Sequence, residues 1–191
     1  MATNTNRWVS EAKDIGVACT RKTDWGLLDK WAVHVGGGLT HRLSRGDALM
    51  IKENDLASLA PGISDECAAV GIAVAGIDLD SHAEFVVVEV RDECQALKAV
   101  TKWSEIQKDL GRSEKIVLLL DNMVPEKCAI IHSNLLEKGL REWCILEGSG
   151  GVVYDDITRW RSSGVDLIST SGLNRGVTPI DISMKVMGAV E

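Results

Sequence analysis

Short apolar segments that alternate with helix-like segments restrict the fold of this chain more than any other feature. Residues 84–90 (EFVVVEV) and 116–120 (IVLLL) are apolar almost throughout, which is typical of strands buried on both faces. Weaker segments of the same kind lie at residues 15–20, 48–51, 143–146 and 165–169. Helical patterns occupy residues 27–34, 64–74, 92–110, 125–136 and 155–163. This alternation predicts an α/β fold with a parallel sheet covered by helices.

Polar or charged residues stand where most of these predicted strands end. The strand ends lead into Thr20-Arg21-Lys22, Lys52, Glu89, Asp121 and Glu147. In a barrel such ends converge on one mouth, whereas in an open sheet they spread along an edge. A complete (β/α)8 barrel takes about 250 residues. We therefore expect an α/β fold of the TIM-barrel type, an incomplete or open (β/α) barrel of about six parallel strands.

The composition is that of a globular protein. The chain has 191 residues, is 45% hydrophobic and carries a formal net charge of −7, so we expect one domain over residues 1–191. Residues 1–12 are polar and are expected to form a partly disordered extension. The acidic balance argues against a nucleic-acid partner. The N-terminus lacks the apolar core of a signal peptide, and the apolar runs are too short to span a membrane.

The five cysteines are widely spaced and form no CxxC pair. This pattern argues against a disulfide framework or a zinc site. We expect small buried thiols in a reducing, cytoplasmic protein, with no membrane partner.

Positive charge gathers in one stretch of this acidic chain. Residues 20–52 contain six Lys or Arg side chains against three Asp or Glu side chains, a local balance of +3. Arg21, Lys22, His41, Arg42 and Lys52 belong to it. Arginine and lysine suit carboxylate or phosphate groups. A focused positive pocket therefore favours a small anionic ligand.

Carboxylates and glycine-rich turns share the predicted mouth with these cations. Glu89 and Asp121 are expected ligands of Mg²⁺, which takes one or two carboxylates together with substrate oxygens. The turns at residues 148–151 and 171–172 would offer backbone N–H groups to a phosphate. Taken one at a time, a cation here is more often a solvated surface charge, and the two carboxylates equally fit buried partners of the lysines. The repetition at successive strand ends favours a polyphosphate site.

Several ordered motifs are spread along the chain: Thr20-Arg21-Lys22-Thr23, Gly36-Gly37-Gly38, His41-Arg42-Leu43, Ile51-Lys52-Glu53-Asn54, Leu119-Leu120-Asp121-Asn122-Met123 and Leu146-Glu147-Gly148-Ser149-Gly150-Gly151. With these motifs, residues 15–185 resemble the barrel domain of quinolinate phosphoribosyltransferase. The resemblance implies transfer of a phosphoribosyl group from PRPP to quinolinate or a related aromatic acid. Pyrophosphate and CO2 are released, and the product enters NAD biosynthesis.

The resemblance also implies a role for each matching residue. Lys22, Glu89 and Asp121 would be catalytic, with Lys22 at PRPP and the two carboxylates facing the ribose and the Mg²⁺-pyrophosphate. The remaining matching residues would bind substrate: Arg21, Arg42 and Lys52 at the quinolinate carboxylates, with His41 nearby; Ser149, Gly150, Gly151, Ser171 and Gly172 at the 5′-phosphate; and Glu147 beside them.

This sequence also departs from the family pattern. Trp25 replaces a proline, Leu28 an arginine, Asp55 a histidine and Ser171 a glycine. We expect the N-terminal sandwich domain of the family to be missing before Thr20. We therefore expect a homo-oligomer, or a separate chain that supplies that domain.

Two other hypotheses remain open. One is a divergent or split-enzyme subunit that keeps the anion pocket but needs a partner chain or takes another anionic substrate. The other is a barrel lyase or isomerase for a phosphorylated sugar acid, which would not bind PRPP.

Overall fold

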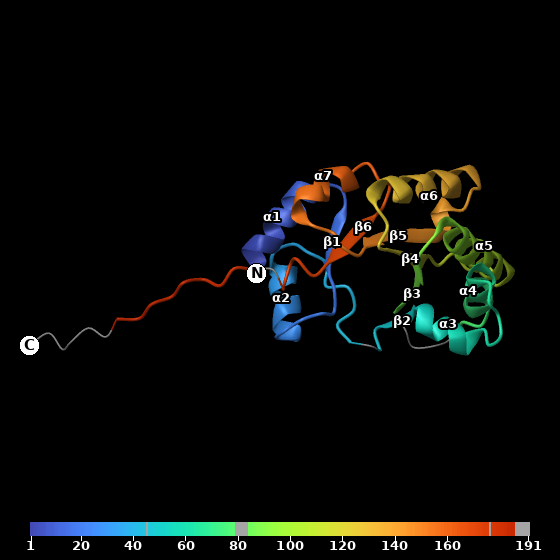
Figure 1. Cartoon of the computed structure of the whole chain (residues 1–191), viewed down its shortest axis with the longest axis horizontal. Coiled ribbons are helices and arrows are strands. Elements are labelled where there is room, and N and C mark those ends of the chain that lie inside the picture. The colour runs from blue at the N-terminus through green and yellow to red at the C-terminus, as the bar shows by residue number, and fades with distance from the viewer. Residues whose placement is uncertain (45, 79–83, 176, 186–191) are drawn as a thin grey trace, which may run out of the picture.

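The computed structural model describes residues 1–44, 46–78, 84–175 and 177–185. Six parallel strands form one open sheet in the order β1-β6-β5-β4-β3-β2, so that β1 and β2 are its edges. Figure 1 shows the sheet bent into an arc with the helices outside it. The expected open barrel of six parallel strands is confirmed. The strands are β1 (Gly16–Cys19), β2 (Ala48–Ile51), β3 (Phe85–Val90), β4 (Ile116–Asp121), β5 (Cys144–Ser149) and β6 (Leu167–Thr170).

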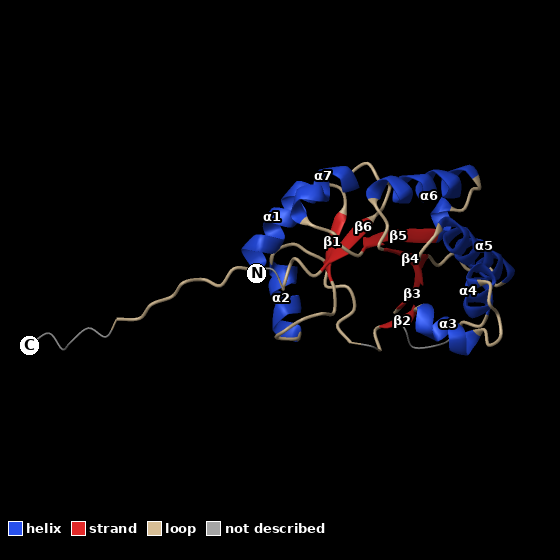
Figure 2. Cartoon of the chain, in the orientation of Figure 1, coloured by secondary structure: helices blue, strands red, loops and turns tan. Residues whose placement is uncertain are grey.

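Helices follow the strands along the chain, which is the arrangement that parallel neighbours require. Figure 2 shows α1, α7, α6, α5, α4 and α3 in turn around the convex side of the arc. The α-helices are α1 (Ala2–Ala12), α2 (Leu27–Val35), α3 (Glu53–Leu59), α4 (Glu66–Ala75), α5 (Glu93–Asp109), α6 (Pro125–Glu137) and α7 (Ile157–Trp160), and the 3₁₀ helices are η1 (Arg141–Trp143) and η2 (Tyr154–Asp156). None of the helices in the described part of the chain has the length and apolar composition needed to cross a membrane.

The two faces of the sheet pack differently. Alternate strand residues, among them Val88, Leu118 and Leu146, point outward into a large core shared with the helices. The other residues point inward, and Val87, Val117 and Leu119 form a smaller cluster made of strand residues alone. Apolar side chains therefore fill the lower interior of the arc, and the polar strand ends lie above them.

The expected disorder of residues 1–12 is wrong, because residues 2–12 form helix α1. Trp8 and Ala12 lie one turn apart on its buried face. The Trp8 ring meets the Tyr154 ring edge-on, with centroids 5.4 Å apart. Arg161 also donates to the Glu11 backbone oxygen near the helix end. These contacts hold α1 on the barrel despite its polar sequence.

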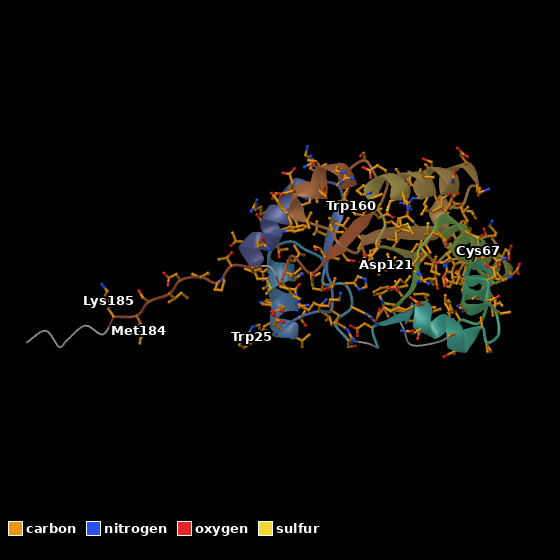
Figure 3. The ribbon with its side chains drawn as sticks, viewed as in Figure 1. Trp25, Cys67, Asp121, Trp160, Met184 and Lys185 are labelled. Carbon is orange, nitrogen blue, oxygen red and sulfur yellow. A yellow bond between two sulfur atoms is a disulfide. The ribbon has the colours of Figure 1, made fainter. Side chains whose placement is uncertain are left out.

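The expectation of free cysteines is wrong for two of the five. Cys67 and Cys94 form a disulfide, whereas Cys19, Cys128 and Cys144 are free and buried. Cys67 lies in the first turn of α4 and Cys94 in the first turn of α5. The two helices run side by side, which brings together cysteines that are 27 residues apart in sequence. Figure 3 labels Cys67 at this outer helix pair.

Two local features also differ from expectation. Helix α4 begins at Glu66, two residues later than the helical pattern at residues 64–74, because Asp65 is its N-cap and its carboxylate accepts hydrogen bonds from the Cys67 and Ala68 N–H groups. Helix α3 was not predicted, because it is short and buries only Leu56.

At the C-terminal end of the described chain, residues 177–185 run away from the barrel in Figure 1.

Candidate active site

One cavity of about 700 Å³ opens at the carboxyl ends of the strands. It takes side chains from every strand end of the arc and from the connection between α2 and β2. All of the residues proposed from the sequence line it: Arg21, Lys22, His41, Arg42, Lys52, Glu89, Asp121, Glu147, Ser149, Gly150, Gly151, Ser171 and Gly172. Figure 3 shows Asp121 inside the arc of strands.

Strand register explains why these residues converge. Glu89 is level with Leu119, Leu119 with Glu147, and Glu147 with Leu167. The next inward layer, one pleat higher, consists of Asp121, Ser149 and Ser169. The inward-facing positions therefore change toward the mouth, from apolar side chains, to glutamates that alternate with leucines, to Asp121 with two serines.

Lys52 and Glu89 form an ion pair across neighbouring strands β2 and β3. The Lys52 backbone is fixed by Asp55, whose carboxylate accepts from the Lys52 N–H at 2.8 Å. Asp55, which departs from the family pattern, thus caps the first turn of α3 and fixes the main chain of Lys52. Glu89 is occupied by this pair, whereas the Asp121 carboxylate accepts, within the described residues, from the Asn122 side chain alone.

His41 and Glu147 form the second pair of the cavity. The His41 Nδ1 accepts from the Arg42 N–H at 2.8 Å, so a neutral ring carries its proton on Nε2. That nitrogen lies 3.0 Å from Glu147 Oε2 and donates to it. The Glu147 side chain is 1% exposed, and its other oxygen, Oε1, has no hydrogen-bond partner among the residues that the structure describes. A buried carboxylate oxygen without a donor is costly and suits a polar group of a ligand.

Arg21 and Lys22 provide the exposed cations of the site. Within the described residues, no ion pair involves either side chain. Asn174 donates to the Lys22 backbone oxygen at 2.7 Å and joins this loop to the segment that follows β6. Arg42 also faces the cavity, and its Nη2 lies 3.1 Å from Met50 Sδ. These cations project from separate loops toward one space.

Glycines and hydroxyl groups shape the opposite side of the cavity. Gly150 has φ +85, and a Cβ there would lie 2.4 Å from Asn122 Oδ1, so only glycine fits. Ser169 donates to the Ser149 hydroxyl at 3.0 Å, and the Gly172 N–H donates to Thr170 Oγ1. This part of the wall is small, polar and close to backbone, as an anion cradle requires.

Several lining residues were missed by sequence reasoning. Thr20, Met50, Leu119, Asn122, Val152, Val153, Ser169 and Thr170 also line the cavity. The two-residue period of β2, β4 and β6 would have placed Met50, Leu119 and Ser169 on the inward face. The pairing of His41 with Glu147 left no signal, because the two residues are far apart in sequence.

Comparison with known proteins agrees with this geometry. A family model described as the C-terminal domain of quinolinate phosphoribosyl transferase matches residues 1–185. A probable nicotinate-nucleotide pyrophosphorylase [carboxylating] of Methanothermobacter thermautotrophicus is 35% identical over 91% of this chain and 57% of its own length. A quinolinate phosphoribosyltransferase [decarboxylating] of Nicotiana tabacum is 32% identical, over 97% of this chain and 52% of its own.

Solved structures give the same result. The nicotinate-nucleotide pyrophosphorylase of Francisella tularensis aligns with a TM-score of 0.72 and 32% identity, over 95% of this chain and 58% of its own. NadC from Streptococcus pyogenes aligns with a TM-score of 0.72 and 27% identity, over 97% and 58%. The chain thus spans only part of the length of the relatives it matches. With its sheet order, its cavity and a family match over residues 1–185, the chain belongs to the quinolinate phosphoribosyl transferase C-terminal domain family.

Proposed function

We propose that this chain carries the phosphoribosyl-transfer site of a quinolinate phosphoribosyltransferase. The observation that supports the proposal most is the single cavity into which Arg21, Lys22, Arg42, Lys52, Glu89 and Asp121 all project. A cavity with several cations, two carboxylates and a small polar wall suits a substrate with phosphate and carboxylate groups. The relatives are named as a nicotinate-nucleotide pyrophosphorylase and a quinolinate phosphoribosyltransferase. In the proposed reaction, PRPP and quinolinate yield nicotinate mononucleotide, pyrophosphate and CO2.

The positive charge that develops at the reacting ribose carbon determines the role of each charged residue in the cavity. As the bond to pyrophosphate breaks, the ribose gains oxocarbenium character, which a nearby carboxylate stabilises. In our proposal Glu89 and Asp121 face the ribose, and Lys22 balances the negative charge of the leaving pyrophosphate. Quinolinate nitrogen forms the new bond, so no covalent enzyme intermediate is required. The positive ring then accepts the electron pair released with CO2, and the vacated carbon takes up a proton.

Arg21, Arg42 and Lys52 are proposed to bind the two quinolinate carboxylates, with His41 beside them. The Glu147 carboxylate keeps the His41 ring oriented. Ser149, Gly150, Gly151, Ser171 and Gly172 are proposed to hold the 5′-phosphate. The left-handed glycines of this wall allow close approach of a phosphate to backbone N–H groups.

The residues of the cavity suit Mg²⁺ that arrives with PRPP. No group of three or more metal-ligating side chains occurs among the described residues. Asp121, with Glu89 near it, offers the one or two carboxylates that Mg²⁺ takes when substrate oxygens complete its shell. Bound Mg²⁺ would neutralise the pyrophosphate charge.

The test measures binding and turnover separately. Calorimetry with Mg²⁺ and PRPP, and with quinolinate, reports binding, and labelled PRPP with quinolinate reports nicotinate mononucleotide and CO2. Lys52→Met should weaken quinolinate binding at least about tenfold, because it removes a cation and frees Glu89 to repel the substrate. Lys102→Met is the matched control, since that lysine pairs with Glu105 on the surface of α5.

The outcomes are distinct. Binding of both substrates with turnover supports the full proposal. If both substrates bind but turnover requires an added sandwich-domain protein, the chain is a subunit that needs another chain. The other arrangement that we propose is a homo-oligomer in the cytoplasm. Absence of PRPP binding refutes the proposal.

A further inference from the structure

Lys30 is a buried lysine beside the cavity but not part of its lining. It lies on α2, and its residue is 3% exposed. Among the described residues no ion pair includes it. Burying an ammonium group is costly unless its donors are satisfied. Its contacts therefore show what keeps a lysine at this position.

The Lys30 ammonium group donates to two backbone carbonyls. One is Cys19 O at 3.1 Å, at the last residue of β1. The other is Thr40 O, in the connection from α2 to β2. Each carbonyl directly precedes a cationic segment of the cavity: Thr20-Arg21-Lys22 after Cys19, and His41-Arg42 after Thr40.

The backbone around Leu39 explains why these carbonyls need a donor. Leu39 pairs with β1 in parallel: its N–H donates to Val17 O, and its carbonyl accepts from the Cys19 N–H. A continued ladder would bring the N–H of residue 41 to Cys19 O. His41 has φ +52, so its backbone leaves the extended path of the ladder, and its ring contacts Glu147. Lys30 supplies the hydrogen bond that the ladder loses at this point.

Asp29, the neighbouring residue, acts on the same region. Its carboxylate accepts from the Asp24 N–H at 3.0 Å and the Trp25 N–H at 3.4 Å. Asp29 is also 3% exposed. Successive helix residues point in different directions, so this pair reaches two different parts of the chain. The loop after β1 is thereby held at its start by Lys30 and at its end by Asp29.

We propose that Lys30 is a positioning residue that fixes the distance between the Arg21-Lys22 and His41-Arg42 segments, and so presets the anion site. This role rests on the proposed function as far as the ligand is concerned. Lys30 touches no substrate in this proposal. It acts through the two carbonyls, and its buried charge adds to the positive potential behind the site.

The experiment compares Lys30→Met, which keeps the aliphatic stem, with Lys30→Gln, which keeps one donor. Hydrogen exchange should rise at residues 20–22 and 40–42 in Lys30→Met and less in Lys30→Gln. Quinolinate affinity should fall roughly ten- to hundredfold in Lys30→Met, since small misplacements of binding groups have effects of this size. Leu135→Ala, in the core on α6, is the control for lost stability alone.

Unchanged exchange at both segments in Lys30→Met, or an equal rise in Leu135→Ala, would overturn the proposal. If Lys30→Met does not fold, Lys30→Gln decides by the same comparison. If the native chain binds no quinolinate, the proposed function fails, yet the exchange data still decide whether Lys30 fixes the two segments. If the native chain binds and the variants bind equally well, the positioning role alone is refuted.

Discussion

Two histidines show how neighbouring residues set the state of an imidazole ring. His41 Nδ1 accepts from a backbone N–H, and His132 Nδ1 accepts from the Arg141 guanidinium at 3.1 Å. His41 faces a carboxylate in the cavity, whereas His132 lies against Gly164 at the amino end of β6. A Cβ at residue 164 would lie 2.3 Å from the His132 ring, so glycine is required there. The same ring type thus serves the site in one place and packing in the other.

His132 gives the fold a dependence on pH. Burial, and then the Arg141 charge, lowers the pKa of His132 below its ordinary value of 6.5. The unfolded chain therefore binds a proton more readily, and this contribution to stability is present above pH 6.5 and is lost as pH falls through the folded pKa. Urea unfolding should be measured between roughly pH 7.5 and pH 5, a range that spans this transition. The free energy of unfolding should fall more steeply with decreasing pH in the native chain than in His132→Gln. Parallel curves would contradict this.

Among the helices, α1 is the element that the sequence least suggests. It is polar, yet Trp8 is buried against Tyr154, and Arg7 lies 4.0 Å above the same ring. Trp8→Ala should lower the unfolding free energy by about 3–5 kcal/mol, because it removes a large buried ring. Trp31→Ala is the control, since that tryptophan is 65% exposed on α2 and should change stability little. Equal effects of the two would mean that α1 does not pack on the barrel.

The disulfide joins α4 to α5 at their first turns. A sequence separation of 27 residues between the two cysteines predicts a contribution of about 3.5 kcal/mol to stability. The double variant Cys67→Ala/Cys94→Ala should show that loss in urea unfolding, and reductant should then have no further effect.

Burial raises the pKa of Cys128 to about 12 and that of Cys144 to about 11, so neither thiol should react with an alkylating reagent in the folded chain. Rapid alkylation of Cys67 without reductant would contradict the disulfide.

The elements differ in how far the sequence predicts them. All six strands are visible as apolar runs because a parallel sheet buries both faces. Helix α3 could not be predicted, because one buried leucine gives no helical periodicity. Helix α1 could not be predicted either, because it has few apolar residues. The disulfide could not be predicted, because it depends on the packing of two helices, and the spacing of the cysteines along the chain does not determine that packing. The site residues are predictable from strand ends, whereas the pairs Lys52–Glu89 and His41–Glu147 depend on register.

At the scale of the whole molecule, the two ends of the barrel carry different tasks. The carboxyl ends of the strands hold the cavity, with exposed cations and a buried Glu147 oxygen that no described residue contacts by a hydrogen bond. The amino ends of β5 and β6 hold a hydrogen-bond network around Arg141. That side chain donates to His132, to the backbone oxygens of Cys144 and Gly164, and to Asp166. Ligand-binding groups at the carboxyl ends and structural contacts at the amino ends are typical of barrels.

This division predicts opposite effects of two substitutions of the same kind. Arg141→Met should lower the unfolding free energy by about 2–4 kcal/mol, because it leaves several acceptors without their donor. The affinity of the folded protein for quinolinate should not change. Lys52→Met should weaken that affinity while changing stability by less than about 1 kcal/mol, since its pair with Glu89 is 47% exposed on the lysine side. Urea unfolding and calorimetry on both variants measure the two quantities independently. Weaker binding in Arg141→Met at a temperature where it is fully folded would show that the two ends are coupled, and that the barrel is not the rigid support that its packed interior indicates.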